Sequence, residues 1–335
     1  MIQLQQNISL KPFNTFGIDM PAEYFTTLSS MDQLAEMTDT AYSKHVLGGG
    51  SNILLSAPVE GLVIHNQLKG ITTEREDNDH IWLRVQSGEV WHELVMHTVN
   101  NGWGGLENLA LIPGTAGASP IQNIGAYGAE ARDTIESVTF WYWAEQRTLT
   151  YTNRDCEFGY RDSIFKQMLK DKALITSVVY KLSKKPTFNT SYGAIEHELD
   201  AMGVTELSPK AIAYAVMHIR QSKLPDPKVT GNAGSFFKNP TISRAQYEEL
   251  YKRYPTIPSY KVSANLVKLP AAWLIEQCGW KGYRRDDMGV HAKQALVIVN
   301  YGDARGEDIW QLSGEVMRTV KDRFGVALER EVQVW

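Results

Sequence analysis

Two glycine-rich segments constrain the fold of this chain more than any other feature. The longer one, IPGTAGASPIQNIGAYG, runs from Ile112 to Gly128, and the shorter one, LGGGSN, runs from Leu47 to Asn52. Glycine loses more backbone entropy on folding than any other residue, and such segments usually serve where backbone N–H groups approach a ligand, most often a phosphate. Either segment alone could be a tight turn, but the two together predict a ligand whose pyrophosphate is held between them.

The shorter segment does not match the dinucleotide-binding fingerprint of doubly wound folds. That fingerprint, G-x-G-x-x-G, connects a strand to a helix. Here Gly48, Gly49 and Gly50 are consecutive, and the residues that follow, 53–55, are typical of a strand. The sequence therefore predicts a nucleotide site in a different architecture.

The composition is that of an ordinary globular protein with room for about two domains in 335 residues. The formal net charge of −4 and the lack of a basic stripe argue against a nucleic-acid binder. The N-terminus does not resemble a signal peptide and no run of about 18 apolar residues occurs, so we expect a cytoplasmic protein with no membrane partner. Cys156 and Cys278 suggest no disulfide framework, and His92, His97 and His291 lack ligand spacing, so we expect no metal.

Hydrophobic periodicity predicts mixed α/β structure along the chain. Strands are expected over 62–65, 82–86, 138–143, 148–152, 174–181 and 296–300, and helices over 89–100, 209–220, 270–278 and 307–324. Ser208 is a suitable N-cap for the second helix, and Gly279 and Gly325 are placed to end the last two. Ser243 and Gln246 resemble a capping box.

The segments RQSKLPDP and GNAGSFFKNP combine cations with a Gly-x-x-Gly-Ser turn. Arg220, Lys223, Lys228 and Lys238 suit carboxylate or phosphate groups, although a hairpin with solvated lysines would have the same composition. No G-x-S-x-G elbow surrounds Ser235, and no histidine base is paired with it in the sequence. We therefore interpret Ser235 as a candidate proton donor or relay and not as a nucleophile.

Two further segments contain candidate catalytic groups. GYRDSIFK places Arg161 beside Asp162, a pair that is usually a weak surface ion pair. The terminal ALEREVQVW alternates like a strand, in which Glu331 either faces water or points into a cleft as a general acid whose pKa is raised by burial. The apolar face of that strand would consist of Val326, Leu328, Val332 and Val334.

All these segments occur together, in this order, in one family. They are LGGGSN, IPGTAGASPIQNIGAYG, YRDSIFK, SKLPDP with GNAGSFFKNP, HAKQALVIVNYGDARGEDI and a terminal L-x-x-E-V. The chain resembles the UDP-N-acetylenolpyruvoylglucosamine reductases, flavoenzymes of bacterial peptidoglycan precursor synthesis. The resemblance covers nearly the whole chain, from Asn14 to Val332, and six ordered motifs are far more specific than any one of them.

The resemblance implies a mixed α/β (α+β) fold. A FAD-binding domain of the vanillyl-alcohol-oxidase type, made of two α/β subdomains, would precede a C-terminal α+β substrate-binding domain. The implied division is 1–68 for the first FAD-binding subdomain, 69–218 for the second, 219–325 for the substrate-binding domain and 326–335 for a C-terminal strand that carries the acid. An insertion near 187–193, with Tyr192, resembles the tyrosine loop of the family's longer subtype.

The resemblance also implies roles for individual residues. Non-covalent FAD would be bound by Gly48, Gly49, Gly50, Ser51, Asn52, Pro113, Gly114, Gly117, Ala118, Ser119, Gln122, Asn123, Gly125, Tyr127 and Arg220. The substrate, UDP-N-acetylglucosamine enolpyruvate, would be bound by Tyr192, Lys223, Asn239 and Gln294. The catalytic residues would be Arg161, Ser235 and Glu331.

The implied reaction yields UDP-N-acetylmuramate, with NADPH as the co-substrate that reduces the flavin. Hydride from flavin N5 would reach C3 of the enol ether, and negative charge would spread from C2 into the carboxylate. Arg161, with Lys223 and Glu331, would stabilise that charge, and Ser235 would give its proton to C2.

Two other functions fit the sequence less well. A flavin oxidase with covalently attached FAD usually has a histidine or cysteine in its flavin loops, and neither glycine-rich segment contains one. A catalytically inactive UDP-sugar sensor would lack Arg161, Ser235 or Glu331, and all three are present. We expect a monomer by family habit. The chain ends at Trp335, four residues after Glu331, where family members often continue, which predicts a less tethered terminal strand.

Overall fold

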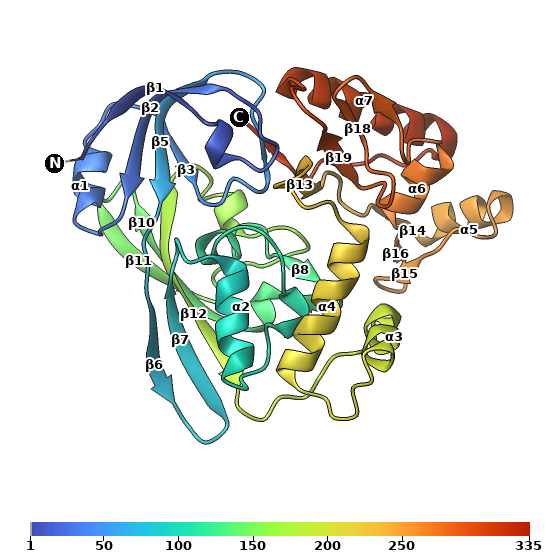
Figure 1. Ribbon diagram of the computed structural model, residues 1–335, viewed down its shortest axis with the longest axis horizontal. Helices are drawn as coiled ribbons and strands as arrows, with labels where there is room; N and C mark the ends of the chain where they lie inside the picture. The colour runs from blue at the N-terminus through green and yellow to red at the C-terminus, as the bar shows by residue number, and fades with distance from the viewer. Residues whose placement is uncertain (1) are drawn as a thin grey trace. The chain divides into compact units, whose positions relative to one another are not determined.

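A computed structural model describes residues 2–335, which divide into two compact units, and Figure 1 labels their helices and strands. The first unit consists of the residues up to Ile8, Ala22–Gly49 and Glu60–Ser222. The second consists of Ser9–Pro21, Gly50–Val59 and Lys223–Trp335. Each unit is therefore assembled from three separate stretches of the chain.

The first unit is built around a five-stranded antiparallel sheet in the order β11-β10-β12-β7-β6. The strands are β6 (Ile71–Glu76), β7 (His80–Gln86), β10 (Ile135–Tyr142), β11 (Arg147–Thr152) and β12 (Ala173–Ser183). Val178 of β12 lies opposite Val85 of β7 and Val138 of β10, so branched side chains meet across three strands. Such cross-strand pairs stabilise the sheet.

Two helices, α2 (Trp91–Asn100) and α4 (Pro209–Lys223), bury their apolar sides in one core with this sheet (Figure 1). That core contains Trp91 of α2, Val216 of α4 and Phe140 of β10, all with no exposed surface. Complete burial of a large apolar side chain stabilises the fold by about 1.5–3 kcal/mol. The Trp91 indole N–H is also satisfied, because it donates to the carbonyl of Leu109 at 2.9 Å.

A second sheet of the first unit has the order β1-β2-β5-β3. Its elements are β1 (Gln5–Ser9), β2 (Pro21–Leu28), β3 (Lys44–Leu47) and β5 (Val59–Asn66), with α1 (Gln33–Thr38) beside them. Leu34 and Leu62 pack here together with Leu174 of β12, which links the two sheets of this unit. The shorter glycine-rich segment begins at the end of β3.

The second unit contains a four-stranded sheet in the order β13-β19-β18-β17. Its strands are β13 (Gly231–Ser235), β17 (Arg284–Arg285), β18 (Met288–Val290) and β19 (Val297–Asn300). The long helix α7 (Gly306–Phe324) packs against β18 and against α6 (Ala271–Gln277). The buried stripe of α7 consists of Ile309, Leu312, Val316, Val320 and Phe324.

The remaining elements are short. The second unit also has β4 (Ile53–Leu54), β14 (Thr241–Ser243), α5 (Arg244–Arg253), β15 (Tyr260–Lys261), β16 (Leu266–Lys268), β20 (Gln333–Val334) and the 3₁₀ turn η1 (Lys11–Phe13). The first unit has η2 (Glu107–Leu109), η3 (Ala116–Ala118), β8 (Gly125–Ala126), β9 (Ala129–Glu130), η4 (Ala131–Asp133), η5 (Ile164–Lys166) and α3 (Gly193–Ala201).

The helices and the strands with strong periodicity agree with the prediction, usually within two or three residues at each end. Ser208 accepts a hydrogen bond from the amide of Ala211, as expected of an N-cap, and Gly325 adopts a left-handed φ of 65° directly after α7. Between residues 2 and 335, no helix has both the length and the apolar composition needed to cross a bilayer.

The predicted C-terminal strand is wrong in extent. Only Gln333–Val334 is strand, and it pairs in parallel with β4, while Arg330 forms an isolated bridge with Phe237. Val334 is 40% exposed and does not share the buried face expected of it. The expectation of a loosely tethered end is also wrong, because the carbonyl of Trp335 accepts hydrogen bonds from both N and Oγ of Ser56.

Candidate active site

The two glycine-rich segments meet within the first unit. A Cβ on Gly49 would lie 3.0 Å from the Cα of Gly114, and one on Gly48 would lie 2.7 Å from Oγ1 of Thr115. Only residues without side chains allow two backbones to approach so closely. The proximity that the pyrophosphate hypothesis requires is therefore present in the structure.

The longer segment is held in an unusual backbone conformation. Asn123 and Tyr127 have left-handed φ angles of 44° and 50°, which are uncommon for residues other than glycine. The Asn123 amide donates to Glu130 Oε2 at 3.0 Å and to the carbonyl of Gly159 at 2.9 Å. Backbone outliers that are held by surrounding bonds often occur at ligand sites.

Two of the predicted FAD-binding residues use their side chains inside the protein. The buried amide of Asn123 is occupied as described, and its Oδ1 accepts from the amide of Arg132 at 3.0 Å. Ser119 is also buried, and its Oγ lies 2.7 Å from the hydroxyl of Tyr180. A contact of either residue with a cofactor would therefore come from its backbone.

Arg161 is attached to the longer glycine-rich segment. Its Nη2 donates to the carbonyl of Gly125 at 2.5 Å, and its Nη1 lies 3.5 Å from the carbonyl of Asn123. Arg161 itself has a left-handed φ of 56°. The guanidinium is thus oriented by this segment, and the structure brings together Arg161 and the predicted flavin loop.

Arg220, on α4, offers a buried hydrogen-bond donor to an anion in the first unit. Its Nε is buried and has no hydrogen-bond partner, although Tyr127 lies beside its guanidinium. Burial lowers the pKa of Arg220, an effect that Tyr127 partly opposes, and burial raises the pKa of Tyr127. A buried cation with an unsatisfied donor is unfavourable until an anionic acceptor reaches it, so these residues fit a pyrophosphate.

His92 supports the same region structurally. Its Nδ1 accepts a hydrogen bond from the amide of Leu111 at 3.0 Å, which requires the neutral ring. Burial lowers the pKa of His92, and the charge of Arg220 lowers it further. Leu111 has a φ of 59°, so His92 helps to hold a strained residue just before the longer glycine-rich segment.

The second unit brings together the shorter glycine-rich segment and the chain around Glu331. The side-chain amide of Asn52 donates to the carbonyl of Glu331 at 3.3 Å, and the amide of Gln333 donates to the carbonyl of Asn52 at 3.0 Å. The amide of Glu331 donates to the carbonyl of Phe236 at 2.8 Å, one residue after Ser235. Three predicted site residues, Asn52, Ser235 and Glu331, thus share one local framework.

The sequence interpretation missed the role of Thr15. The Thr15 amide donates to the carbonyl of Gly50 at 3.1 Å, and its hydroxyl donates to the carbonyl of Asn232 in β13 at 2.6 Å. A Cβ on Gly50 would lie 1.9 Å from the carbonyl oxygen of Phe13, so this fit requires glycine. Thr15 directly follows Asn14, the residue at which the family resemblance begins, and this position was its only signal in the sequence.

The predicted substrate-binding residues are partly occupied by structural bonds. Asn239 Oδ1 accepts from the amide of Ala271, the first residue of α6, at 2.9 Å, and Gln294 Oε1 accepts from the amide of Leu296 at 3.3 Å. Tyr192 is 45% exposed, and its ring meets that of Tyr127 edge-on at 5.4 Å. Lys223 is an exposed residue at the end of α4.

The predicted catalytic set draws on both units. Arg161 belongs to the first unit, and Ser235 and Glu331 belong to the second. The predicted FAD-binding residues are divided in the same way, because the boundary falls between Gly49 and Gly50.

Comparisons with known proteins agree with these features. Residues 22–150 match a family model described as an FAD binding domain, and residues 226–335 match one described as UDP-N-acetylenolpyruvoylglucosamine reductase, C-terminal domain. A protein of that name from Flavobacterium johnsoniae is 49% identical, covering 99% of this chain and 100% of its own length. Another from Amoebophilus asiaticus is 48% identical, covering 99% of each chain. The crystal structure of UDP-N-acetylenolpyruvylglucosamine reductase from Thermus caldophilus shares the fold over 100% of both chains, with a TM-score of 0.70 at 24% identity.

Proposed function

Because this chain belongs to the UDP-N-acetylenolpyruvoylglucosamine reductase family, we propose that it works through the residues that its glycine-rich segments and the chain around Glu331 bring together. It is an FAD-dependent oxidoreductase that reduces UDP-N-acetylglucosamine enolpyruvate to UDP-N-acetylmuramate with NADPH, a step of peptidoglycan precursor synthesis. Two observations carry the assignment to a site: the close approach of Gly49 to Gly114, and the buried Nε of Arg220, which has no hydrogen-bond partner within the protein.

FAD, when bound, supplies the chemistry that accepts hydride from NADPH and passes it to C3 of the enolpyruvyl double bond. Backbone amides around Gly48, Gly49 and Gly114 would hold its pyrophosphate, and Arg220 would complete the hydrogen bonding of that anion. In the second unit, Asn52 would contribute through its backbone, because its side-chain amide donates to the carbonyl of Glu331.

Arg161 would stabilise the negative charge that develops on the substrate carboxylate. Its guanidinium is held by the carbonyls of Asn123 and Gly125, so little reorganisation would be needed when the charge forms. Preorganised charge of this kind is among the largest contributions to catalysis. Lys223 would bind the same carboxylate, and Glu331 would assist as an acid or by a strong hydrogen bond.

Ser235 would donate the proton to C2 and set the configuration of the lactyl ether. Tyr192, Asn239 and Gln294 would bind the substrate, with Tyr192 on a loop that closes over it. The amide group of Asn239 is suited to this, since only its oxygen is used to begin α6. The enzyme would act in the cytoplasm as a monomer, with the functional division at 1–68, 69–218, 219–325 and 326–335.

The substitution Ser235→Ala tests the proton-donor assignment. The variant should still be yellow and should still be reduced by NADPH, because hydride transfer to FAD does not involve this hydroxyl. Turnover with the enolpyruvyl substrate should fall by about 10²–10⁴-fold, the usual contribution of a general acid. Flavin absorbance in stopped flow separates the two half-reactions.

Ser243→Ala is a matched control for this experiment. Ser243 caps α5 by accepting from the amide of Gln246, so its loss should lower stability by about 1 kcal/mol and leave both half-reactions unchanged. Turnover of the Ser235 variant within twofold of the parent would show that another group supplies the proton. A protein that cannot be reconstituted with FAD would contradict the function as a whole.

A further inference from the structure

The chain around Glu331 has few strand contacts of its own. On one side, the amide of Lys238 donates to the carbonyl of Glu329 at 2.9 Å, and the amide of Glu331 donates to the carbonyl of Phe236 at 2.8 Å. On the other side, regular pairing begins only at Gln333. A segment with so short a ladder needs other contacts if one of its side chains is to be placed accurately.

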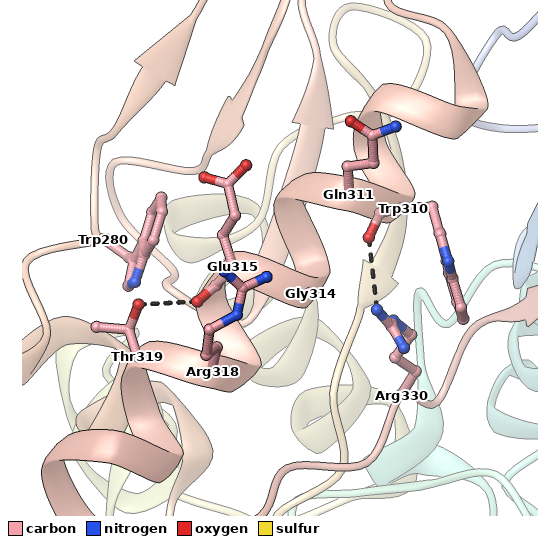
Figure 2. A pocket seen from close by; sticks show the side chains of 8 residues that line it. All are labelled: Trp280, Trp310, Gln311, Gly314, Glu315, Arg318, Thr319 and Arg330. Carbon is pink, nitrogen blue, oxygen red and sulfur yellow. Dashed lines mark hydrogen bonds between the residues drawn. The ribbon is translucent and has the colours of Figure 1, made fainter.

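The side chain of Arg330, the residue before Glu331, supplies such contacts. Its guanidinium carbon lies 3.4 Å from the centroid of the Trp310 ring, stacked on the indole (Figure 2). Its Nε donates to Oγ of Ser313 at 2.7 Å, and its Nη2 lies 3.4 Å from the carbonyl of Trp310. Three interactions therefore attach this one residue to a single turn of α7.

The attachment point on α7 is buried. Ser313 is fully buried, and its Oγ also donates to the carbonyl of Trp310 at 2.6 Å. The same part of α7 contributes Leu312 and Val316 to the core, both with no exposed surface. Arg330 thus connects the irregular terminal segment to one of the best-packed helices of the unit.

The residues around Arg330 do not draw its guanidinium away from the contacts with α7. Within residues 2–335, no carboxylate lies within ion-pair distance of Arg330, and the nearby Glu315 is engaged by Arg285, whose Nη2 lies 2.9 Å from Oε1. A Cβ on Gly314 would lie 3.5 Å from Nη2 of Arg330, an ordinary van der Waals contact, so the guanidinium lies directly beside this turn of α7. Arg330, Trp310, Gly314 and Glu315 line a cavity of about 630 Å³, which Figure 2 shows from close by.

We propose that Arg330 is a positioning residue for Glu331, and through it for the pairing of the acid with the chain at Ser235. The side chain of Arg330 fixes one end of the Arg330–Glu331 peptide on α7, and the Glu331 amide fixes the other end on Phe236. The carboxyl group of Glu331 is thereby held at a fixed position relative to Ser235 and the chain that follows it. This inference rests on the proposed role of Glu331.

The test compares the two half-reactions of holoenzyme carrying Arg330→Gln. Reduction of the flavin by NADPH and the dissociation constant of the enolpyruvyl substrate should stay within twofold of the parent. Reoxidation of the reduced flavin by that substrate should slow by about tenfold to a hundredfold, as expected when a catalytic group is misplaced by about 1 Å. Arg330→Lys should restore little of the rate, because an ammonium group reproduces neither the planar stack nor the Nε bond.

A double-mutant cycle distinguishes positioning from general damage. If Arg330 acts through Glu331, then Arg330→Gln should slow reoxidation by less than twofold in a Glu331→Gln background. General damage to the fold would instead slow reoxidation by the same factor whether or not Glu331 is present. Ser313→Ala removes the acceptor of Nε together with the bond from Oγ to the carbonyl of Trp310, and leaves the stack on Trp310 in place. It should slow reoxidation several-fold, which keeps the test valid if the arginine variants fold poorly.

Arg318→Gln is the matched control, because Arg318 lines the same cavity and lies on α7 itself. It should leave both half-reactions at the parent rate. The inference would be overturned if Arg330→Gln were reoxidised at the parent rate. It would also be overturned if Arg330→Gln slowed reoxidation by the same factor in the Glu331→Gln background as in the parent. Parent-like reoxidation in Glu331→Gln alone would overturn it by removing the proposed role of Glu331, whereas failure of NADPH to reduce the flavin would count against the proposed function itself.

Discussion

The substitution Arg220→Met should weaken cofactor binding without lowering the stability of the FAD-free protein. Without an anion nearby, the buried Nε of Arg220 leaves a desolvated charge incompletely bonded. With a pyrophosphate present, the same group would make a charge-assisted hydrogen bond. Methionine keeps much of the apolar stem of the side chain and removes the charge, so the variant isolates this difference.

Both magnitudes follow from these contacts. A hydrogen bond to a charged group contributes about 1.5–3 kcal/mol, so the dissociation constant for FAD should rise about 10- to 150-fold. Removing an unsatisfied buried donor should favour the FAD-free fold by about 1–3 kcal/mol, and the loss of the contact with Tyr127 should offset about 1 kcal/mol. The free energy of unfolding of the FAD-free protein should therefore be unchanged or raised by up to about 2 kcal/mol.

Fluorescence titration of FAD-free protein measures the affinity, and urea unfolding of the same preparation measures the stability. Arg285→Met is the control, since Arg285 Nε also lacks a partner but its guanidinium is paired with Glu315. That control should lose up to about 1 kcal/mol of stability and bind FAD normally. An Arg220 variant that binds FAD within threefold of the parent would refute the reasoning, as would a FAD-free protein destabilised by more than about 2 kcal/mol.

Three further results are expected. Gly49→Ala should weaken FAD binding about tenfold in the same titration, because its Cβ would lie 3.0 Å from the Cα of Gly114 and one loop must move. Tyr180→Phe should lower the free energy of unfolding by about 1–3 kcal/mol in urea, since the buried Oγ of Ser119 loses its partner. Burial raises the pKa of Cys156 to about 12. The thiol therefore ionises first in the unfolded chain, and stability should fall by about 1.4 kcal/mol per pH unit above about pH 9. The free energy of unfolding of Cys156→Ala should therefore fall less between pH 8 and pH 10 than that of the parent.

Elements that depend on local pattern could be predicted from the sequence. The helix expected over 307–324 is Gly306–Phe324, because its apolar stripe repeats at helical spacing from Ile309 to Phe324 and Gly325 ends it. The strand expected over 174–181 is the centre of Ala173–Ser183 for a similar reason, since it is rich in branched and aromatic residues. In both cases the information lies within a single window of the chain.

Elements that depend on distant partners could not be predicted in this way. The alternation expected from residue 326 holds for Val326, Leu328 and Val332 and fails at the exposed Val334. Alternation reports burial and says nothing about which backbone will pair with the segment. The expected capping box is only half formed for the same reason. Ser243 accepts from the amide of Gln246 as predicted, but the Gln246 side chain donates to the carbonyl of Gly325, 79 positions away.

The residues of the site likewise divide into those predictable from local sequence and those that depend on distant partners. Glycine content alone indicated that the segments at Gly49 and Gly114 approach something closely, and the structure shows that they approach each other. The orphaned Nε of Arg220 and the bonds of Thr15 depend on three-dimensional burial, which no pattern at either position encodes. The roles of Arg161, Ser235 and Glu331 come from the family resemblance and stay predictions until the variants are measured.

The three-part construction of the second unit has a consequence for biosynthesis. The amide of Ser56 bonds to the carbonyl of Trp335, 279 positions later. At about 5–20 residues per second, a ribosome needs roughly 15–60 s to make the chain between them. During that time Ile53 and Leu54 have no strand partner, so nascent chains should depend on a holding chaperone. A tag fused after Trp335 should disturb assembly more than one placed before Ile2.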